Sequence, residues 1–120
     1  MLRLAEDTRI YISTQAVDGR KAINGLAALV VEQFETSVND GSVYVFYNKE
    51  RNRVKCLFWD KNGFVLYHKR LERGKFKFNK QPDGSCIITH QQLDWLLAGL
   101  DFMLMVEFPM LDFSCVFRRC

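Results

Sequence analysis

The chain has 120 residues, of which 48% are hydrophobic and 26% are charged. These proportions are typical of one soluble globular domain and exclude a disordered or fibrous protein. The N-terminal segment meets Glu6 and Asp7 early and lacks the apolar core of a secretory signal peptide. Acidic residues and a proline interrupt the apolar C-terminal segment, so we expect a cytoplasmic protein without a membrane span.

Positive charge is concentrated in the middle of the chain. Residues 49–80 contain eleven Lys and Arg and three acidic residues, a net charge of +8, whereas the remainder has six against eleven, a net charge of −5. Neutralisation of phosphates supplies most of the sequence-independent affinity for nucleic acids, so this asymmetry favours a polyanionic partner. A solvated basic sheet face is the alternative interpretation.

The four cysteines do not form a metal-binding motif. Cys56, Cys86, Cys115 and Cys120 have no C-x-x-C spacing, and the chain has only two histidines to join them as ligands. We therefore expect reduced thiols, two of them packed as small hydrophobic side chains, and neither a metal site nor a cofactor.

In chain order, the first expected elements are a strand and a helix. A β-prone run covers residues 9–13, and Asp18 offers an N-cap for an amphipathic helix over residues 19–36. This placement puts Arg20 and Lys21 in the first helical turn, where the helix dipole disfavours cations. The two side chains either bind an anion or an acidic neighbour there, or simply extend into water.

A turn at Asn39–Gly41 precedes three expected strands, namely Val43–Tyr47, Arg53–Trp59 and Phe64–Leu71. Asn62-Gly63 is a strong signal for a hairpin between the second and third strands, because both residues tolerate positive φ. Lys75–Phe78 alternates as a further strand or edge.

Near the end of the chain, Thr89 and Gln92 have the spacing of a capping box for a second amphipathic helix, with Gly99 as its stop. The predicted fold class is α+β, an antiparallel β-meander of about four or five strands with two amphipathic helices packed on one face. We expect residues 1–102 to form a single domain and residues 103–120 to form an apolar tail that covers the core or mediates self-association.

The expected hairpin collects cations on one face. With Asn62-Gly63 as a two-residue loop, Lys55 pairs with Arg70 and Arg53 with Glu72, and a four-residue loop shifts the partners by two residues. Because side chains alternate between the two faces of a sheet, a shift by two residues leaves each side chain on its own face. The same basic residues therefore share a face in either register: Arg53, Lys55, His68 and Arg70. Like charges opposite each other cost stability, which a bound phosphate backbone would offset.

Trp59 lies on this same face, either as a core residue or as a stacking platform for bases. The opposite face of the hairpin is the more apolar one and the better candidate for the core; it carries Val54, Cys56, Phe58, Val65, Tyr67 and Leu71.

Three stretches of sequence carry a family pattern: DGRKAINGLAALV at 18–30, NRVKCLFWDKNG at 52–63 and YHKRLERGKF at 67–76. In order and spacing they resemble the TnpB or Orf2-like accessory family of the sixty-six family of bacterial insertion sequences, which is distinct from the RNA-guided nucleases that share the TnpB name. The resemblance runs from about Leu2 to Phe102. The chain departs from the family pattern at residues 19–25, at Phe78-Asn79 and in its apolar tail.

The resemblance implies a chain that supports transposition beside a separate DDE-type transposase, which carries out the strand chemistry. One hypothesis is a DNA-binding module, whose candidate nucleic-acid contacts are Arg20, Lys21, Arg53, Lys55, Trp59, His68, Lys69, Arg70, Arg73 and Lys75. The other is a protein-interaction subunit whose basic hairpin meets an acidic surface of the transposase.

An enzyme is the third possibility, and the motifs argue against it. Metal-dependent phosphoryl chemistry needs converging carboxylates, and the only acids inside the motifs are Asp18, Asp60 and Glu72, for which structural roles are the simpler explanation. No nucleotide fingerprint or nucleophile pattern is present, so we expect no catalytic residue.

Overall fold

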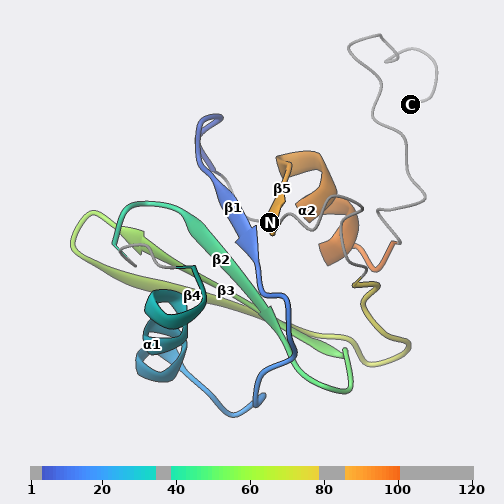
Figure 1. The fold of residues 1–120 in the computed structure, drawn as a ribbon. Helices are drawn as coiled ribbons and strands as arrows, with labels where there is room; N and C mark the ends of the chain where they lie inside the picture. Colours follow the sequence, from blue (N-terminus) through green and yellow to red (C-terminus); the bar gives the residue numbers. More distant parts are fainter. Residues whose placement is uncertain (1–3, 35–38, 79–85, 101–120) are drawn as a thin grey trace, which may run out of the picture.

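The computed structural model describes residues 4–34, 39–78 and 86–100 (Figure 1). Within these ranges five strands form one sheet in the order β4-β3-β2-β1-β5, accompanied by two helices. The elements are β1 (Ile10–Ile12), α1 (Ile23–Phe34), β2 (Val43–Tyr47), β3 (Arg53–Asp60), β4 (Gly63–Arg70), β5 (Ile87–Ile88) and α2 (His90–Leu97). The predicted α+β class is confirmed.

The expected meander forms the larger part of the sheet. β2, β3 and β4 pair antiparallel in succession. β1 instead pairs parallel with β2, which requires a crossover connection, and α1 provides it. The short strand β5, which the sequence did not signal, pairs antiparallel with the far edge of β1. The sheet is therefore mostly, but not wholly, antiparallel.

The two helices cover opposite faces of the sheet, so the expectation that both pack on one face is wrong. α1 packs through Leu26 and Val30 on a mainly aromatic face that includes Tyr11, Tyr44 and Phe46. α2 packs its leucines on an aliphatic face that includes Ile10, Val43 and Val45. The physical reason lies in β2, where aliphatic and aromatic side chains alternate and both faces are buried. In Figure 1 the helices lie on either side of the strands.

α1 begins at Ile23, four residues later than predicted. Asp18 does not cap it; the Asp18 side chain accepts a hydrogen bond from the backbone N–H of Arg20 at 2.9 Å, and the N–H of Lys21 donates to the Asp18 carbonyl at 3.0 Å. These contacts form a turn that precedes the helix. Arg20 and Lys21 therefore lie outside the first helical turn, and the expected conflict with the helix dipole does not arise.

The signals at the ends of α2 are confirmed. Thr89 is its N-cap and forms a reciprocal capping box with Gln92. Gly99 adopts a φ of 84°, and the N–H of Leu100 donates to the carbonyl of Trp95 at 2.9 Å, which closes the C-terminus of the helix in the way that glycine permits.

The β3–β4 hairpin turns one residue earlier than predicted. Asp60 pairs with Gly63, so the loop is Lys61-Asn62, and Lys61 has a φ of 53°. The N–H of Asn62 donates to the Asp60 carbonyl at 2.5 Å and closes the turn around Lys61. Each residue of β3 therefore pairs two positions away from the partner expected with an Asn62-Gly63 loop. The side chains remain on the faces that were predicted for them.

Residues 75–78 do not form the predicted strand. Phe76 and Phe78 are buried and the two lysines are exposed, as the alternation suggested, and the N–H of Phe76 donates to the Arg51 carbonyl at 2.7 Å. Phe78 stacks on Tyr47 with ring centroids 3.9 Å apart. The aromatic side chains explain the alternation without strand pairing.

Cys56 is fully buried, as predicted for a small hydrophobic side chain, and burial raises the pKa of its thiol to about 12. Cys86 is partly buried and also free. Cys115, Cys120 and the predicted tail 103–120 lie outside the described residues. No helix in the described ranges is long and apolar enough to cross a membrane.

Candidate functional site

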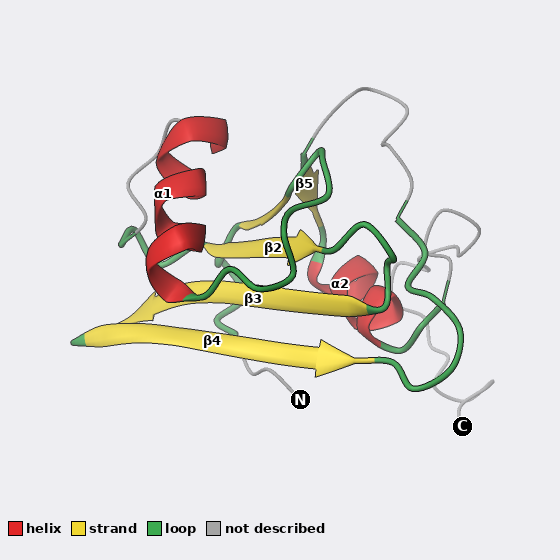
Figure 2. Ribbon diagram, turned by 90° about the horizontal axis from the view of Figure 1, so that it is seen from below, coloured by secondary structure: helices red, strands yellow, loops and turns green. Residues whose placement is uncertain are grey.

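Two pairs of basic residues face each other directly across β3 and β4. Arg53 is the partner of Arg70, and Lys55 is the partner of His68. All four side chains project from the α1 side of the sheet, because they share parity with Leu57 and Leu66 of the aromatic core. Figure 2 shows α1 standing over the hairpin end of these strands, with the loop that precedes the helix running beside β3 toward the other end of the strand.

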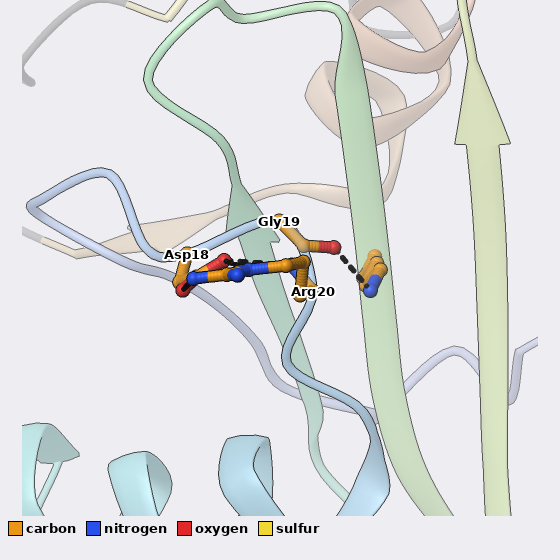
Figure 3. Close-up of polar contacts among 4 residues, drawn as sticks. Asp18, Gly19 and Arg20 are labelled. Carbon is orange, nitrogen blue, oxygen red and sulfur yellow. Dashed lines mark hydrogen bonds and ion pairs between the residues drawn. The ribbon is translucent and has the colours of Figure 1, made fainter.

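Lys55 anchors that loop to the sheet. Its ammonium group donates to the carbonyl of Gly19 at 2.8 Å and to the carbonyl of Lys21 at 2.6 Å. The first of these bonds is drawn in Figure 3. Burial, followed by the charge of Arg53, lowers the pKa of Lys55, and Asp18 opposes the shift. Lys55 therefore holds two backbone carbonyls and positions the loop beside β3.

Arg20 is held by an acid of its own loop. Its guanidinium binds the Asp18 carboxylate through two contacts, Nε to Oδ1 at 3.1 Å and Nη2 to Oδ2 at 2.8 Å (Figure 3). These hydrogen bonds hold the pKa of Asp18 well below its usual range. The Arg20 side chain is nevertheless 89% exposed, so its remaining surface is available to a partner.

The loop and the β2–β3 turn enclose an open cleft of about 380 Å³. Its lining residues are Asp18, Gly19, Arg20, Asn48, Glu50, Asn52 and Arg53. The two walls are close at Gly19, where an added Cβ would lie at ordinary contact distance, 3.4 Å from Cβ of Asn48 and 3.8 Å from the Arg53 side chain. The cleft places the guanidinium groups of two different chain segments at one opening.

Asn48 shapes this cleft and was missed by the sequence reasoning. Its buried side chain accepts hydrogen bonds through Oδ1 from the N–H groups of Asn52, at 3.1 Å, and Arg53, at 3.0 Å. Its Nδ2 donates to Oδ1 of Asn52 at 2.7 Å. The available signal was an asparagine directly after an apolar strand, which is typical of a turn held by a side chain.

Comparisons with known proteins identify the family. The sequence model of the IS66 Orf2 like protein family matches residues 8–106. The chain belongs to this family. Two similar chains come from Sinorhizobium fredii (strain NBRC 101917 / NGR234): uncharacterized protein y4jC is 37% identical and uncharacterized protein y4hO is 32% identical, each over 102 residues. The aligned part is 85% of this chain and 87% and 89% of theirs. No solved structure matches.

Membership in the IS66 Orf2-like family confirms the resemblance found in the sequence and gives the chain an accessory role in the transposition of an insertion sequence, alongside a transposase. The matched region contains every residue that lines the cleft.

The structure brings together only some of the ten predicted nucleic-acid contacts of this family member. Those that meet on the β3–β4 face or the loop beside it are Arg20, Lys21, Arg53, Lys55, His68 and Arg70. Arg73 and Lys75 are exposed in the segment after β4 and do not line the cleft.

Lys69 and Trp59 lie apart from this group. The side chain of Lys69 is on the opposite face of β4, where Nζ donates to the Leu97 carbonyl at 2.7 Å and so stabilises the C-terminus of α2. Trp59 lies at the hairpin end, half-buried and edge-on to Phe64 with ring centroids 5.0 Å apart. It is neither a fully buried core residue nor an open platform.

The carboxylates near the cationic face are already engaged. Glu72 binds Nε of Arg70 at 2.9 Å, in place of the expected pair with Arg53, because Arg70 occupies the position opposite Arg53. The pKa of His68 is lowered by partial burial first, and then by the charges of Lys55, Arg53 and Arg70. In the described part of the chain no group of three or more His, Cys, Asp or Glu is arranged to hold a metal ion.

Proposed function

We propose that this IS66 Orf2-like protein supports transposition by binding the phosphate backbone of DNA on the face formed by Arg53, His68 and Arg70, with Arg20 at its margin. The observation that carries the proposal is the direct pairing of Arg53 with Arg70 across two strands. Like charges at directly opposite positions destabilise a sheet, and an anion between them removes that cost.

The geometry of this face suits a run of phosphates. Arginine presents a planar set of donors that matches a phosphate, and basic side chains at neighbouring positions of one face can follow a backbone. The carboxylates of Asp18 and Glu72 orient Arg20 and Arg70 while leaving both arginines mostly exposed. Lys55 contributes indirectly, because its ammonium group positions the loop that carries Arg20.

His68 adds a dependence on pH to the proposed binding. Partial burial and then the surrounding cations lower its pKa, which favours the neutral imidazole in the free protein. A bound phosphate supplies the opposite charge and raises that pKa, so binding takes up a proton. We therefore expect DNA affinity to increase as the pH falls from 8 toward 6.

A second candidate function is binding of an acidic surface of the transposase on the same face. The ion pairs Arg20–Asp18 and Arg70–Glu72 favour it, because in each of them an arginine donates to a carboxylate. A protein with this function would purify without nucleic acid. Its binding to the transposase would not depend on the length of added DNA.

The experiment that tests the proposal is a fluorescence anisotropy titration with duplex DNA from the element ends and with a scrambled duplex of equal length. The double variant Arg53→Ala, Arg70→Ala should bind more weakly, with a log–log salt slope lower by about 0.9 for each phosphate that the variant no longer neutralises. A double variant that removes two cations outside the face, Arg9→Ala with Lys61→Ala, is the matched control.

The control variant should keep most of the affinity if the face is the binding surface. Equal losses in both double variants would show that only net charge matters and would remove the site. If the wild-type protein does not bind DNA at low salt but co-elutes with the transposase, the first function is wrong and the second is supported.

A further inference from the structure

β4 is an eight-residue strand at the margin of the sheet. Figure 2 shows it outside β3, and among residues 4–34, 39–78 and 86–100 no strand pairs with its outer side. Long edge strands present unpaired backbone N–H and C=O groups, and proteins usually protect them or use them to pair with another chain.

The ladder with β3 determines which residues of β4 face outward. Asn52 accepts a backbone hydrogen bond from Leu71 at 2.8 Å, and in an antiparallel pair the hydrogen-bonded positions alternate. Counting back from Leu71, the odd-numbered residues of β4 bond to β3. The N–H and C=O groups directed to the open edge belong to Phe64, Leu66, His68 and Arg70.

We propose that this edge is the contact between two copies of the chain, in which the β4 strands pair antiparallel around a two-fold axis at Tyr67. In this register Phe64 of each copy faces Arg70 of the other, and Leu66 faces His68. Every outward-directed backbone group of β4 then has a partner. A shift by two residues in either direction leaves one of these four residues without a partner in β4.

The charge pattern of β4 fits this self-pairing. The first half of the strand, Phe64–Tyr67, is apolar, and the second half, His68–Arg70, is cationic. Antiparallel pairing around Tyr67 sets the cationic half of one copy against the apolar half of the other, so no two cations are directly opposite. Cross-strand partners that avoid like charges and include aromatic rings stabilise such pairs. The pairing also covers Val65, which is 38% exposed.

The two-fold pairing has a geometric consequence for the cationic faces. Directly paired residues of antiparallel strands point to the same side of a sheet, so the faces of both copies lie on one side of a continuous sheet. The dimer does not depend on the proposed DNA binding, and it is tested in the absence of DNA.

The test is sedimentation equilibrium of the full chain and of the variant His68→Pro, with His68→Ala as the matched control. Proline removes an outward N–H that is not part of the β3 ladder, so the strand itself tolerates it, whereas pairing with a second copy is blocked. The wild type and His68→Ala should dimerise, and His68→Pro should weaken the dimer by at least about tenfold.

A second pair of variants keeps the test valid if His68→Pro does not fold. In the proposed register Val65 faces Lys69 of the other copy, so Val65→Lys should weaken the dimer while Val65→Glu should not. A monomeric wild type would overturn the proposal, including one whose β4 edge binds only an acidic strand of another protein. A dimer that resists both His68→Pro and Val65→Lys would overturn it as well.

Discussion

Arg53→Glu should make the protein more stable and weaker in DNA binding. The substitution replaces the facing pair Arg53–Arg70 with an opposite-charge pair at the same strand positions. Removing a like-charge contact and adding a favourable one contribute about 0.2–1 kcal/mol each. Arg70 is 55% exposed and already bound to Glu72, so solvent and competition reduce the expected gain to about 0.5–1 kcal/mol.

The assays for this prediction are urea unfolding, followed by circular dichroism, and anisotropy with duplex DNA. The free energy of unfolding should rise by about 0.5–1 kcal/mol, which corresponds to an increase in Tm of about 2–6 °C for a domain of this size. The salt slope of DNA binding should fall by at least about 0.9. Arg9→Glu makes the same change in charge near the start of β1, away from the cleft, and should leave DNA binding largely unchanged. Loss of stability in Arg53→Glu, or unchanged binding, would refute the reasoning.

The other predictions concern single side chains. Lys55→Met should lower the free energy of unfolding by about 1–3 kcal/mol, since the carbonyls of Gly19 and Lys21 lose a charged donor; equal urea midpoints would contradict the anchoring role. Because the folded pKa of His68 lies below the unfolded value of 6.5, the unfolded state binds the proton more readily, and stability should decline as the pH falls below about 6.5. His68→Gln should lessen that decline, and an unaltered pH profile would exclude His68 as a source. Iodoacetamide should label Cys86 but spare Cys56 in the native protein, as peptide mass spectrometry can establish.

Features set by local sequence were predictable. The bounds of β2, the capping box of α2 and the stop at Gly99 all depend on neighbouring residues, and each was confirmed. The shared face of the hairpin cations was also predictable, because parity survives a shift of the turn by one residue on each strand.

Features set by long-range contacts were not predictable from pattern alone. The parallel pairing of β1 with β2 and the positions of the helices on opposite faces depend on which strands meet in space. The start of α1 was missed because the Asp18 side chain bonds to Arg20 in a turn, an alternative that competes with helix capping.

The candidate site shows the same division between local and long-range features. The basic residues themselves were visible in the sequence. That Lys69 has a structural role, unlike Arg70 on the opposite face, follows only from its hydrogen bond to the Leu97 carbonyl at the end of α2. The cleft depends on Asn48, whose role arises from backbone groups that fold back toward it. Side chains that satisfy buried backbone groups carry no charge or motif by which a sequence search would recognise them.

The most direct test of DNA binding on the cationic face is a backbone amide NMR titration of the isotope-labelled protein with duplex DNA from the element ends. The proposal predicts chemical-shift changes centred on Gly19, Arg53, His68 and Arg70, decreasing as salt is raised. Changes centred on Lys69 and α2, or no changes at low salt, would contradict it.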